Sequence, residues 1–363
     1  MIFSEKAAER IRNIQLKMQQ SFEFVNPIPI ANWNQMVLKK DGYSIFHSSN
    51  WALVLNDTYS YKPCYLINFD GDSFSTIVPV AEIRSAITGN RGVSLPFSDF
   101  CEPIIPEKSS SAEFIDLIID KGKQSGWKYF EIRGGDSFFK PSNRLTSYFV
   151  HELQLEMNEK KIYENLRSST KRNIRKANRE GVRIELSCTQ QAMRAFYQLN
   201  CVTRKRHRLP PQPYKFFENV HKNIISNGMG FVALAVYRKR VIAGAVFFHF
   251  GKKAMYKYGG SDPAFQKLRA NNLLIWEAIR WYSSRDFLLF DLGRTEPGNT
   301  GLNQFKDGWG GRRRIVSYYK YDIEREKFLT RDNGIPEILK KFFHNLPLPL
   351  LRVIGNVAYK HIG

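Results

Sequence analysis

The sequence predicts an α/β (α+β) protein of two similar halves in tandem, each a mixed, mostly antiparallel sheet flanked by helices. The 363 residues are enough for two domains of about 150 residues each. The content of 43% hydrophobic and 14% aromatic residues is typical of a globular chain. A hairpin, a helix and an apolar strand follow one another in the same order in both halves.

In the first half, Tyr65–Val80 reads as two strands around an Asp70-Gly71 turn, which predicts a β-hairpin. The segment AEFIDLIIDKGKQ then predicts a helix, and Trp127–Gly135 predicts a strand.

The second half repeats this order. Phe231–Phe250 predicts a hairpin with Arg238–Arg240 at its turn, NNLLIWEAIRWYSS predicts a helix, and Phe287–Arg294 predicts a strand. Aligning Phe130–Ile132 with Phe290–Leu292 superimposes the two series, each strand ending in an acid and a Gly. Duplication explains this agreement better than the alternative, a chance likeness of two α/β halves.

The join between the halves lies near residues 148–162, where Phe149–Met157 reads as a strand that leaves the first half. We predict an N-terminal domain over residues 1–155, a C-terminal domain over 156–330 and a helical tail over 331–363. Two prolines break the tail, and its apolar end carries Arg352, Lys360 and His361. The tail either docks on the body or touches a membrane surface.

The net charge of +21, from 55 basic and 34 acidic residues, favours polyanionic partners: nucleic acid, phosphate-bearing substrates or an anionic membrane. The charged N-terminal segment lacks the apolar core of a signal peptide. No run of about 18 apolar residues is present. Four scattered cysteines form no CxxC and lie near no His at metal-ligand spacing. We therefore expect a cytoplasmic protein with reduced thiols and no metal site.

The segment IYENLRSSTKRNIRKANREGV predicts one basic amphipathic helix that Gly181 closes. Its basic residues, Arg172, Arg175 and Lys176 among them, share half of a helical wheel without an acid between Glu164 and Glu180. Such like charges repel one another, so we expect an anion to bind there; a solvated face is the alternative.

The stretch Asp291–Gly311 reads as a Gly-rich loop after an apolar strand, with Phe305, Lys306 and Trp309 in one short turn. A lone Lys in such a loop is usually solvated, and an acid at the strand end either serves chemistry or pairs with Arg294.

Two further groups are candidates. Tyr256 and Tyr258 alternate along a predicted strand, so both are expected on one side, facing a cleft or the core. Arg204 and Arg208 belong to a basic run before Pro210-Pro211, which either grips substrate phosphates or is a solvated loop.

Several motifs together resemble the Fem family of peptidyl transferases within the GNAT acyltransferase superfamily. The likeness is closest to FemAB-related proteins linked with bacterial exopolysaccharide and cell-envelope systems, and it spans about residues 90–320. The motifs are LPFSDF (Leu95–Phe100), SSTKRNIRKANREGV (Ser168–Val182), LNCVTRKRHRLPPQP (Leu199–Pro213), YKYGGSD (Tyr256–Asp262), LRANNLLIWEAI (Leu268–Ile279) and the Asp291–Gly311 stretch.

The resemblance implies two tandem GNAT-like domains and transfer of an acyl or aminoacyl group onto an amine. It implies aminoacyl-tRNA or acyl-CoA as donor, without a tightly bound cofactor. It also implies a UDP-linked or lipid-linked anionic envelope precursor as acceptor, with tRNA and a peripheral contact at the inner membrane face as further partners. The long helical arm of some bridge-forming relatives is absent from the sequence pattern, which weakens the case for tRNA. Monomer and dimer are both open.

The resemblance also assigns roles. Lys306 would stabilise the oxyanion or a donor phosphate, Phe305 and Trp309 would form apolar walls, and Asp291 would orient or deprotonate the amine. Tyr256 and Tyr258 would donate hydrogen bonds. The Gly-rich pyrophosphate turn of acetyl-CoA enzymes is replaced by Gln266–Asn272, where Arg269, Asn271, Asn272 and a helix N-terminus would hold a phosphate. The rival interpretation is a non-catalytic module that binds polyanions through its basic surface.

Overall fold

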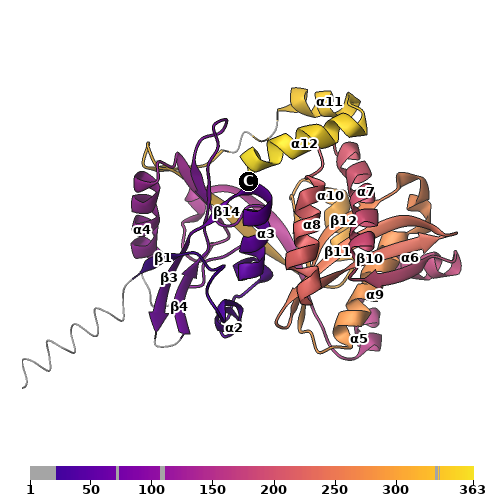
Figure 1. The fold of residues 1–363 in the computed structure, drawn as a ribbon. Coiled ribbons are helices and arrows are strands. Elements are labelled where there is room, and N and C mark those ends of the chain that lie inside the picture. The colour runs from indigo at the N-terminus through magenta and orange to yellow at the C-terminus, as the bar shows by residue number, and fades with distance from the viewer. Residues whose placement is uncertain (1–21, 71–72, 107–110, 332–333, 335) are drawn as a thin grey trace, which may run out of the picture.

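The computed structural model describes residues 22–70, 73–106, 111–331, 334 and 336–363. Two halves lie side by side, and two C-terminal helices lie on top of the second half, with the end of the chain reaching the first (Figure 1). Two parts of the chain for which the sequence makes predictions lie outside the described residues: the N-terminal segment and Gly71 of the first hairpin turn. No helix within those ranges is both long and apolar enough to cross a bilayer.

The first half confirms the predicted hairpin, helix and strand. The hairpin strands pair antiparallel and join the edge strand at Glu23–Val25 in a small three-stranded sheet. The elements are β1 (Glu23–Val25), α2 (Trp33–Leu38), the 3₁₀ turn η1 (Ile45–His47), α3 (Ser49–Tyr59), β2 (Lys62–Pro63), β3 (Tyr65–Asp70), β4 (Ser73–Val78), β5 (Ala81–Ile83), β6 (Arg91–Val93), α4 (Ser111–Gln124), β7 (Tyr129–Arg133), η2 (Pro141–Asn143) and β8 (Arg144–Gln154).

The second half confirms its hairpin, helix and strand in the same order. Its elements are α5 (Glu159–Asn165), α6 (Ser168–Arg179), β9 (Arg183–Ser187), α7 (Gln190–Arg206), α8 (Tyr214–Asn223), η3 (Ile225–Asn227), β10 (Gly230–Tyr237), β11 (Arg240–Phe250), β12 (Lys253–Ser261), η4 (Pro263–Leu268), α9 (Ala270–Ser283), β13 (Leu289–Thr295), α10 (Thr300–Asp307), β14 (Arg312–Asp322), β15 (Lys327–Leu329), α11 (Glu337–Asn345) and α12 (Leu348–Ile362).

One sheet runs through both halves, whereas the sequence predicts a sheet in each. Its order is β2-β5-β6-β7-β14-β8-β13-β12-β11-β10-β9, with β15 paired to β14. Strand β14, from the end of the second half, enters between β7 and β8 of the first and pairs antiparallel with both. Strand β8 also pairs with β13. The backbone hydrogen bonds of the two halves are therefore shared.

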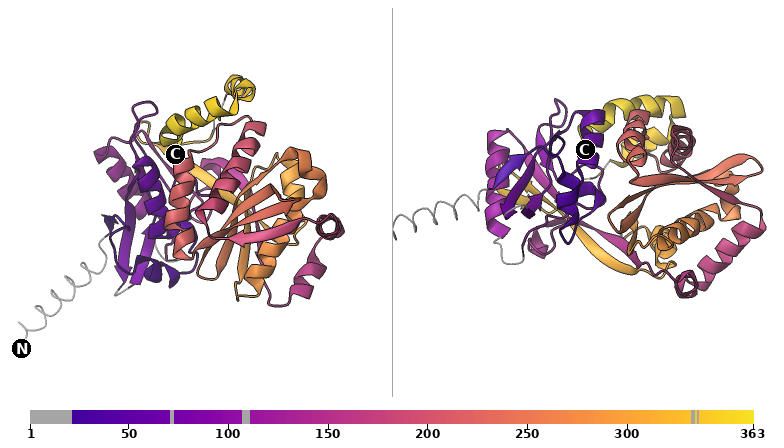
Figure 2. Two further views of the ribbon diagram at one scale, coloured as in Figure 1. Left: turned by 45° about the vertical axis from the view of Figure 1, so that its right-hand side comes forward. Right: turned by 60° about the horizontal axis from the view of Figure 1, so that its bottom comes forward.

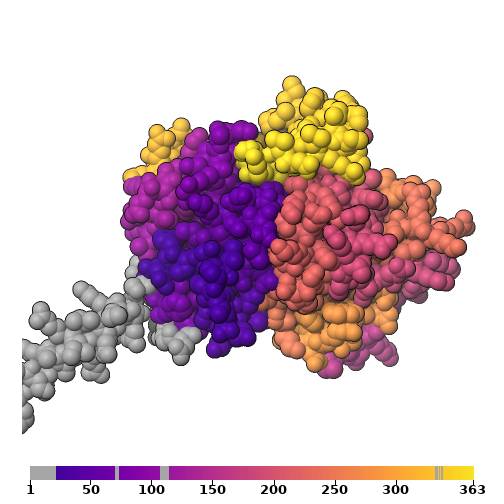
Figure 3. Space-filling view, in the orientation of Figure 1, coloured from indigo at the N-terminus to yellow at the C-terminus, as the bar shows by residue number. Residues whose placement is uncertain are grey.

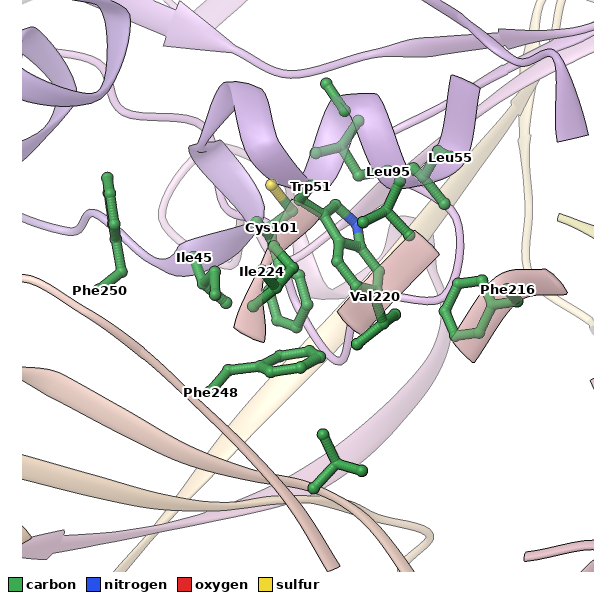
Figure 4. Close-up of a cluster of buried hydrophobic side chains, with 14 of the residues drawn as sticks. Ile45, Trp51, Leu55, Leu95, Cys101, Phe216, Val220, Ile224, Phe248 and Phe250 are labelled. Carbon is green, nitrogen blue, oxygen red and sulfur yellow. The ribbon is translucent and has the colours of Figure 1, made fainter. Parts of the chain in front are cut away.

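Helices cover the second half of the sheet on two faces (Figure 2). Helices α7 and α8 pack on one face against Val246 and Phe248, while α9 packs on the other against Ala245 and Phe247. The first of these cores continues into the other half. Figure 4 shows Trp51 of α3 among side chains of α8 and β11, with its ring 6.1 Å from that of Phe216 and 5.9 Å from that of Phe248. A shared apolar core thus joins the halves in addition to the shared sheet.

Two local predictions are wrong. The single basic helix is broken into α5 and α6, because the backbone is extended at Leu166 and Arg167. The Gly181 closure does hold, with φ at +83° just after α6. The expected Gly-rich loop over Asp291–Gly311 contains helix α10, since the Asn299 side chain caps it by accepting from the Leu302 N–H.

Candidate active site

Two adjoining cavities lie where β12, β13, α9 and α10 meet. The larger, the charged cavity, has a volume of about 370 Å³, and the smaller, the helix-start cavity, about 130 Å³ at the beginning of α9. Ser261 and Asn271 border both, so a ligand could extend from one into the other. The charged or titratable side chains around the charged cavity are Asp99, Arg206, His207, Tyr256, Lys257, Arg294 and Lys306.

Lys306, the first catalytic candidate of the sequence, is buried on α10 and borders the charged cavity. Its ammonium donates to the carbonyl oxygens of Gly293 at 2.6 Å and Arg294 at 3.1 Å. Burial lowers the pKa of Lys306 from 10.5 to about 8. Because an ammonium has three hydrogens, one remains for a ligand in the cavity.

Asp291, the predicted carboxylate, is buried at the centre of β13. One of its oxygens accepts from the Gly293 N–H at 2.6 Å, and its Oδ2 has no hydrogen-bond partner among the described residues. Burial, with the charge of Asp99 nearby, raises the pKa of Asp291 from 3.8 to about 7. A carboxylate with this pKa and a free oxygen suits a general base near neutral pH.

Asp291 does not line the charged cavity; it borders a third cavity of about 380 Å³ between the halves, together with Glu102, Glu152 and Arg314. The alternative pairing of Asp291 with Arg294 is not formed. Arg294 instead donates to the Tyr318 hydroxyl at 2.5 Å and lies 4.4 Å from the Tyr148 ring centroid.

An ion pair that the sequence analysis missed brings the halves together at the charged cavity. Lys257 of β12 donates to Asp99 Oδ1 and to the Phe97 carbonyl, each at 2.7 Å. Burial lowers the pKa of Lys257; although burial alone raises that of Asp99, Lys257 and Arg294 bring it below its ordinary value. Tyr318 of β14 donates to the Asp99 carbonyl at 2.7 Å and so fixes this loop.

Gly293 lies among these charges and cannot be replaced without displacing them. Its φ is +75°, a region that favours glycine. A Cβ at this position would lie 2.9 Å from Asp99 Oδ2 and 3.8 Å from the Lys306 ammonium. Because Gly293 has no side chain, the carboxylate of Asp99 from the first half and the ammonium of Lys306 from the second half can both approach it.

The two candidate tyrosines lie on opposite faces of the sheet, so the prediction of one shared face is wrong. The pairing of β11 with β12 shifts between Val246↔Tyr258 and Phe247↔Tyr256, a bulge that places an extra residue at Lys257. Tyr256 borders the charged cavity. Tyr258 instead packs against the rings of Phe216 and Phe217.

The predicted donor-binding residues gather around the helix-start cavity. Arg269, Asn271, Asn272 and Phe305 all border it, together with the first backbone groups of α9. That helix has no side chain capping its N-terminus, so its N–H groups are available to an anion. Trp309 is fully buried in the core with α9 and is not a wall of either cavity, which corrects its predicted role.

The basic residues predicted to bind anions lie elsewhere. Arg172, Arg175 and Lys176 on α6 border neither the charged nor the helix-start cavity. Arg204 donates to the Tyr359 hydroxyl of α12 at 2.7 Å, and Arg208 is exposed with φ at +59°. Their neighbours Arg206 and His207 border the charged cavity in their place. Asp99 and Lys257, which the sequence analysis missed, each lie within one of the motifs quoted above. Membership of these motifs could have marked them as candidates.

Within the described ranges, no group of three or more His, Cys, Asp or Glu is arranged to hold a metal ion. The chemistry that these residues themselves can supply is electrostatic and acid–base: a buried lysine, a carboxylate with a raised pKa and helix-terminal N–H groups.

Comparison with known proteins concerns the domain and the fold. Residues 164–307 match the family model described as "Acetyltransferase (GNAT) domain". Among solved structures, FemX is similar with a TM-score of 0.63 and 12% identity over 79% of this chain and 96% of that chain. A tandem GNAT protein from the clavulanic acid biosynthesis pathway is similar with a TM-score of 0.55 and 7% identity over 84% and 98%. L-PGS from Bacillus licheniformis is similar with a TM-score of 0.50 and 13% identity over 91% and 96%. No curated protein sequence matches.

The matched domain over residues 164–307, together with the fold, defines an acyltransferase of GNAT type. Over most of its length the chain shares the fold of FemX and of a tandem GNAT protein. The sequence prediction of the fold class and of an acyltransferase is therefore confirmed.

Proposed function

We propose that the protein transfers an acyl or aminoacyl group onto an amine of an envelope-related, phosphate-bearing acceptor, at the cytoplasmic face of the membrane. The observation that carries this proposal is that Asp291, with one free buried oxygen, and Lys306, with one free hydrogen, both bind Gly293 of β13, Asp291 at its N–H and Lys306 at its carbonyl. They supply the base and the cation that acyl transfer to an amine requires.

In the proposed reaction the amine nitrogen attacks the acyl carbon of the donor and forms the new N–C bond. Asp291 takes the proton that the amine loses, while the ammonium of Lys306 stabilises the negative charge on the carbonyl oxygen. The C–O bond of an aminoacyl ester, or the C–S bond of a thioester, then breaks, and the leaving oxygen or sulfur takes up the proton that Asp291 received. Phe305, beside the helix-start cavity, limits water around the donor.

Two sets of residues support a phosphate-bearing donor. The uncapped start of α9 and Arg269 offer N–H groups and a guanidinium at the helix-start cavity. Either aminoacyl-tRNA or acyl-CoA carries phosphate, so an acyl-CoA-dependent N-acyltransferase is the second candidate. The resemblance of the sequence motifs to the Fem family, together with the fold shared with FemX, is the reason to place the acceptor in the cell envelope.

The test is reconstitution with purified protein, a UDP-linked muropeptide as acceptor, and either aminoacyl-tRNA or acyl-CoA as donor, with amide formation followed by mass spectrometry. We expect a product with one donor class only, and calorimetric titration with coenzyme A separates the two donors. Steeply salt-dependent nucleic-acid binding without turnover of any donor would instead favour the non-catalytic module.

A further inference from the structure

The two C-terminal helices turn large apolar side chains outward. Both helices lie at the outer edge of the molecule, on top of the second half, and the end of α12 reaches the first half (Figures 1 and 3). On α12 the exposed positions follow a spacing of three and four residues and form one stripe. The apolar residues in question, from 43% to 77% exposed, are Ile338, Leu339 and Phe342 of α11 and Leu350, Val353 and Val357 of α12; they are named here the C-terminal apolar face.

The opposite stripe of α12 fixes the helix on the body. Leu351, Gly355 and Tyr359 are buried, and a Cβ at Gly355 would lie 2.0 Å from the Pro211 carbonyl oxygen. The Tyr359 hydroxyl accepts from Arg204 and donates to the Pro210 carbonyl. Since these contacts fix the rotation of α12, its outward apolar stripe is a defined surface of the folded molecule.

A basic cavity of about 740 Å³, the C-terminal cavity, opens beside this face. Arg352, Asn356 and Lys360, one turn apart, border it from α12, and Arg194 and Lys215 border it from α7 and α8. Glu218 is the one carboxylate among its lining residues. The cavity therefore has four cations against one acid.

We propose that the C-terminal apolar face docks on an anionic lipid bilayer and that the C-terminal cavity receives a headgroup phosphate. A helix that lies in a bilayer surface has an apolar stripe beside a basic one, as α12 has. Its segment LPLLRVIGNVAYKHI contains no acid, and the chain carries +21 formal charges, which complement anionic lipid.

The docked helix is connected to the charged cavity. The Tyr359 ring lies 5.7 Å from that of Phe97, whose carbonyl accepts from Lys257. Helix α7 carries Arg204 to Tyr359 and, two residues on, Arg206 to the charged cavity. This inference goes beyond the proposed reaction and does not depend on it, because lipid binding is measured without donor or acceptor.

The experiment is sedimentation of the full-length protein with vesicles of phosphatidylglycerol and phosphatidylcholine, or of phosphatidylcholine alone. We expect binding that prefers the anionic vesicles. The double variant Val353→Asn/Val357→Asn should lower partitioning at least about tenfold on the anionic vesicles, because it removes apolar area from the bilayer contact. The matched control Met157→Asn/Leu288→Asn, which alters similarly exposed apolar residues away from α12, should leave binding unchanged.

A second pair of variants tests the cavity. Lys215→Gln/Lys360→Gln should lower binding to anionic vesicles about thirtyfold, from about 1 kcal/mol for each cation at an anionic surface. Lys140→Gln/Lys160→Gln removes the same charge from other surfaces and should change binding much less. Equal losses from both pairs would overturn the cavity assignment. The docking proposal is overturned if the wild-type protein does not sediment with anionic vesicles, or if light scattering without vesicles shows that the asparagine variant breaks a dimer.

Discussion

At the scale of single residues, the site depends on opposite charges that are held apart by backbone. Lys306 is engaged by two carbonyl oxygens, and Asp291 by one N–H, so neither side chain neutralises the other through a direct ion pair. Both retain one free position in a buried setting, where charge interactions are stronger than in water. This arrangement preserves a base and a cation for a substrate.

Lys306→Ala should lower kcat by about two to three orders of magnitude, as the loss of one oxyanion donor does. The measurement is the steady-state rate of amide formation with the donor that the reconstitution identifies. Lys160→Ala, at an exposed lysine, is the matched control and should keep the wild-type rate. If the folded Lys306→Ala protein kept full turnover, Lys306 would have no part in the mechanism.

The pH profile of kcat/KM should be bell-shaped. Activity needs Asp291 ionised, so kcat/KM rises with pH through about 7, and it needs Lys306 protonated, so kcat/KM falls above about 8. Asp291→Asn should remove the rising limb and lower the rate. Lys306→Arg should move the falling limb to higher pH, because a guanidinium stays protonated. If both limbs of the pH profile stayed at the same pH in the two variants, groups other than Asp291 and Lys306 would control the pH dependence.

At the scale of elements, the fixed position of α12 can be tested at Gly355. A methyl group there meets the Pro211 carbonyl, so Gly355→Ala should destabilise the protein by about 1–3 kcal/mol, as overpacking does. In Gly355→Ala the backbone amides of Leu348–Ile362 should exchange faster than in the wild-type protein, and this increase should be larger there than in the rest of the chain. Gly298→Ala is the control, because a Cβ at Gly298 meets no atom within 4 Å. Unchanged exchange and unfolding temperature in Gly355→Ala would mean that this contact relaxes freely.

The regular elements were predictable because alternation and helical periodicity are local. Both hairpins, α4, α9 and the strands after them follow from their own residues. The opposite facing of Tyr256 and Tyr258 was not predictable, because the bulge arises from pairing with β11. Helix α10 was mistaken for a loop because Gly and Pro precede it, although Asn299 three residues before Leu302 was a usable cap signal.

The candidate site was predictable only in part. Lys306, Asp291 and Asn271 do lie at the cavities, because they belong to motifs that the resemblance marks. The contact of Asp99 with Lys257 joins the two halves, and neither local sequence contains the other. Trp309 was misplaced because composition does not reveal which side of the turn after α10 faces the core.

At the scale of the whole molecule, the shared sheet predicts that the first half does not fold alone. Strands β7 and β8 do not pair with each other; each pairs with β14, which belongs to the end of the second half. A fragment of residues 22–155 therefore leaves one edge of β7 and both edges of β8 open, and it should lack a cooperative unfolding transition in circular dichroism. The full chain should unfold in one transition, and a cooperative transition in the fragment would contradict this.

The insertion of β14 has a consequence for synthesis on the ribosome. Strands β7 and β8 leave the ribosome long before β14 (Arg312–Asp322). In the order of the sheet, no other strand can take the place of β14 between them. The nascent first half must therefore wait, incompletely paired, until nearly the whole chain has been translated. Cellular yield of this protein should consequently respond to chaperone supply and to elongation speed across the second half more than to the stability of the finished molecule.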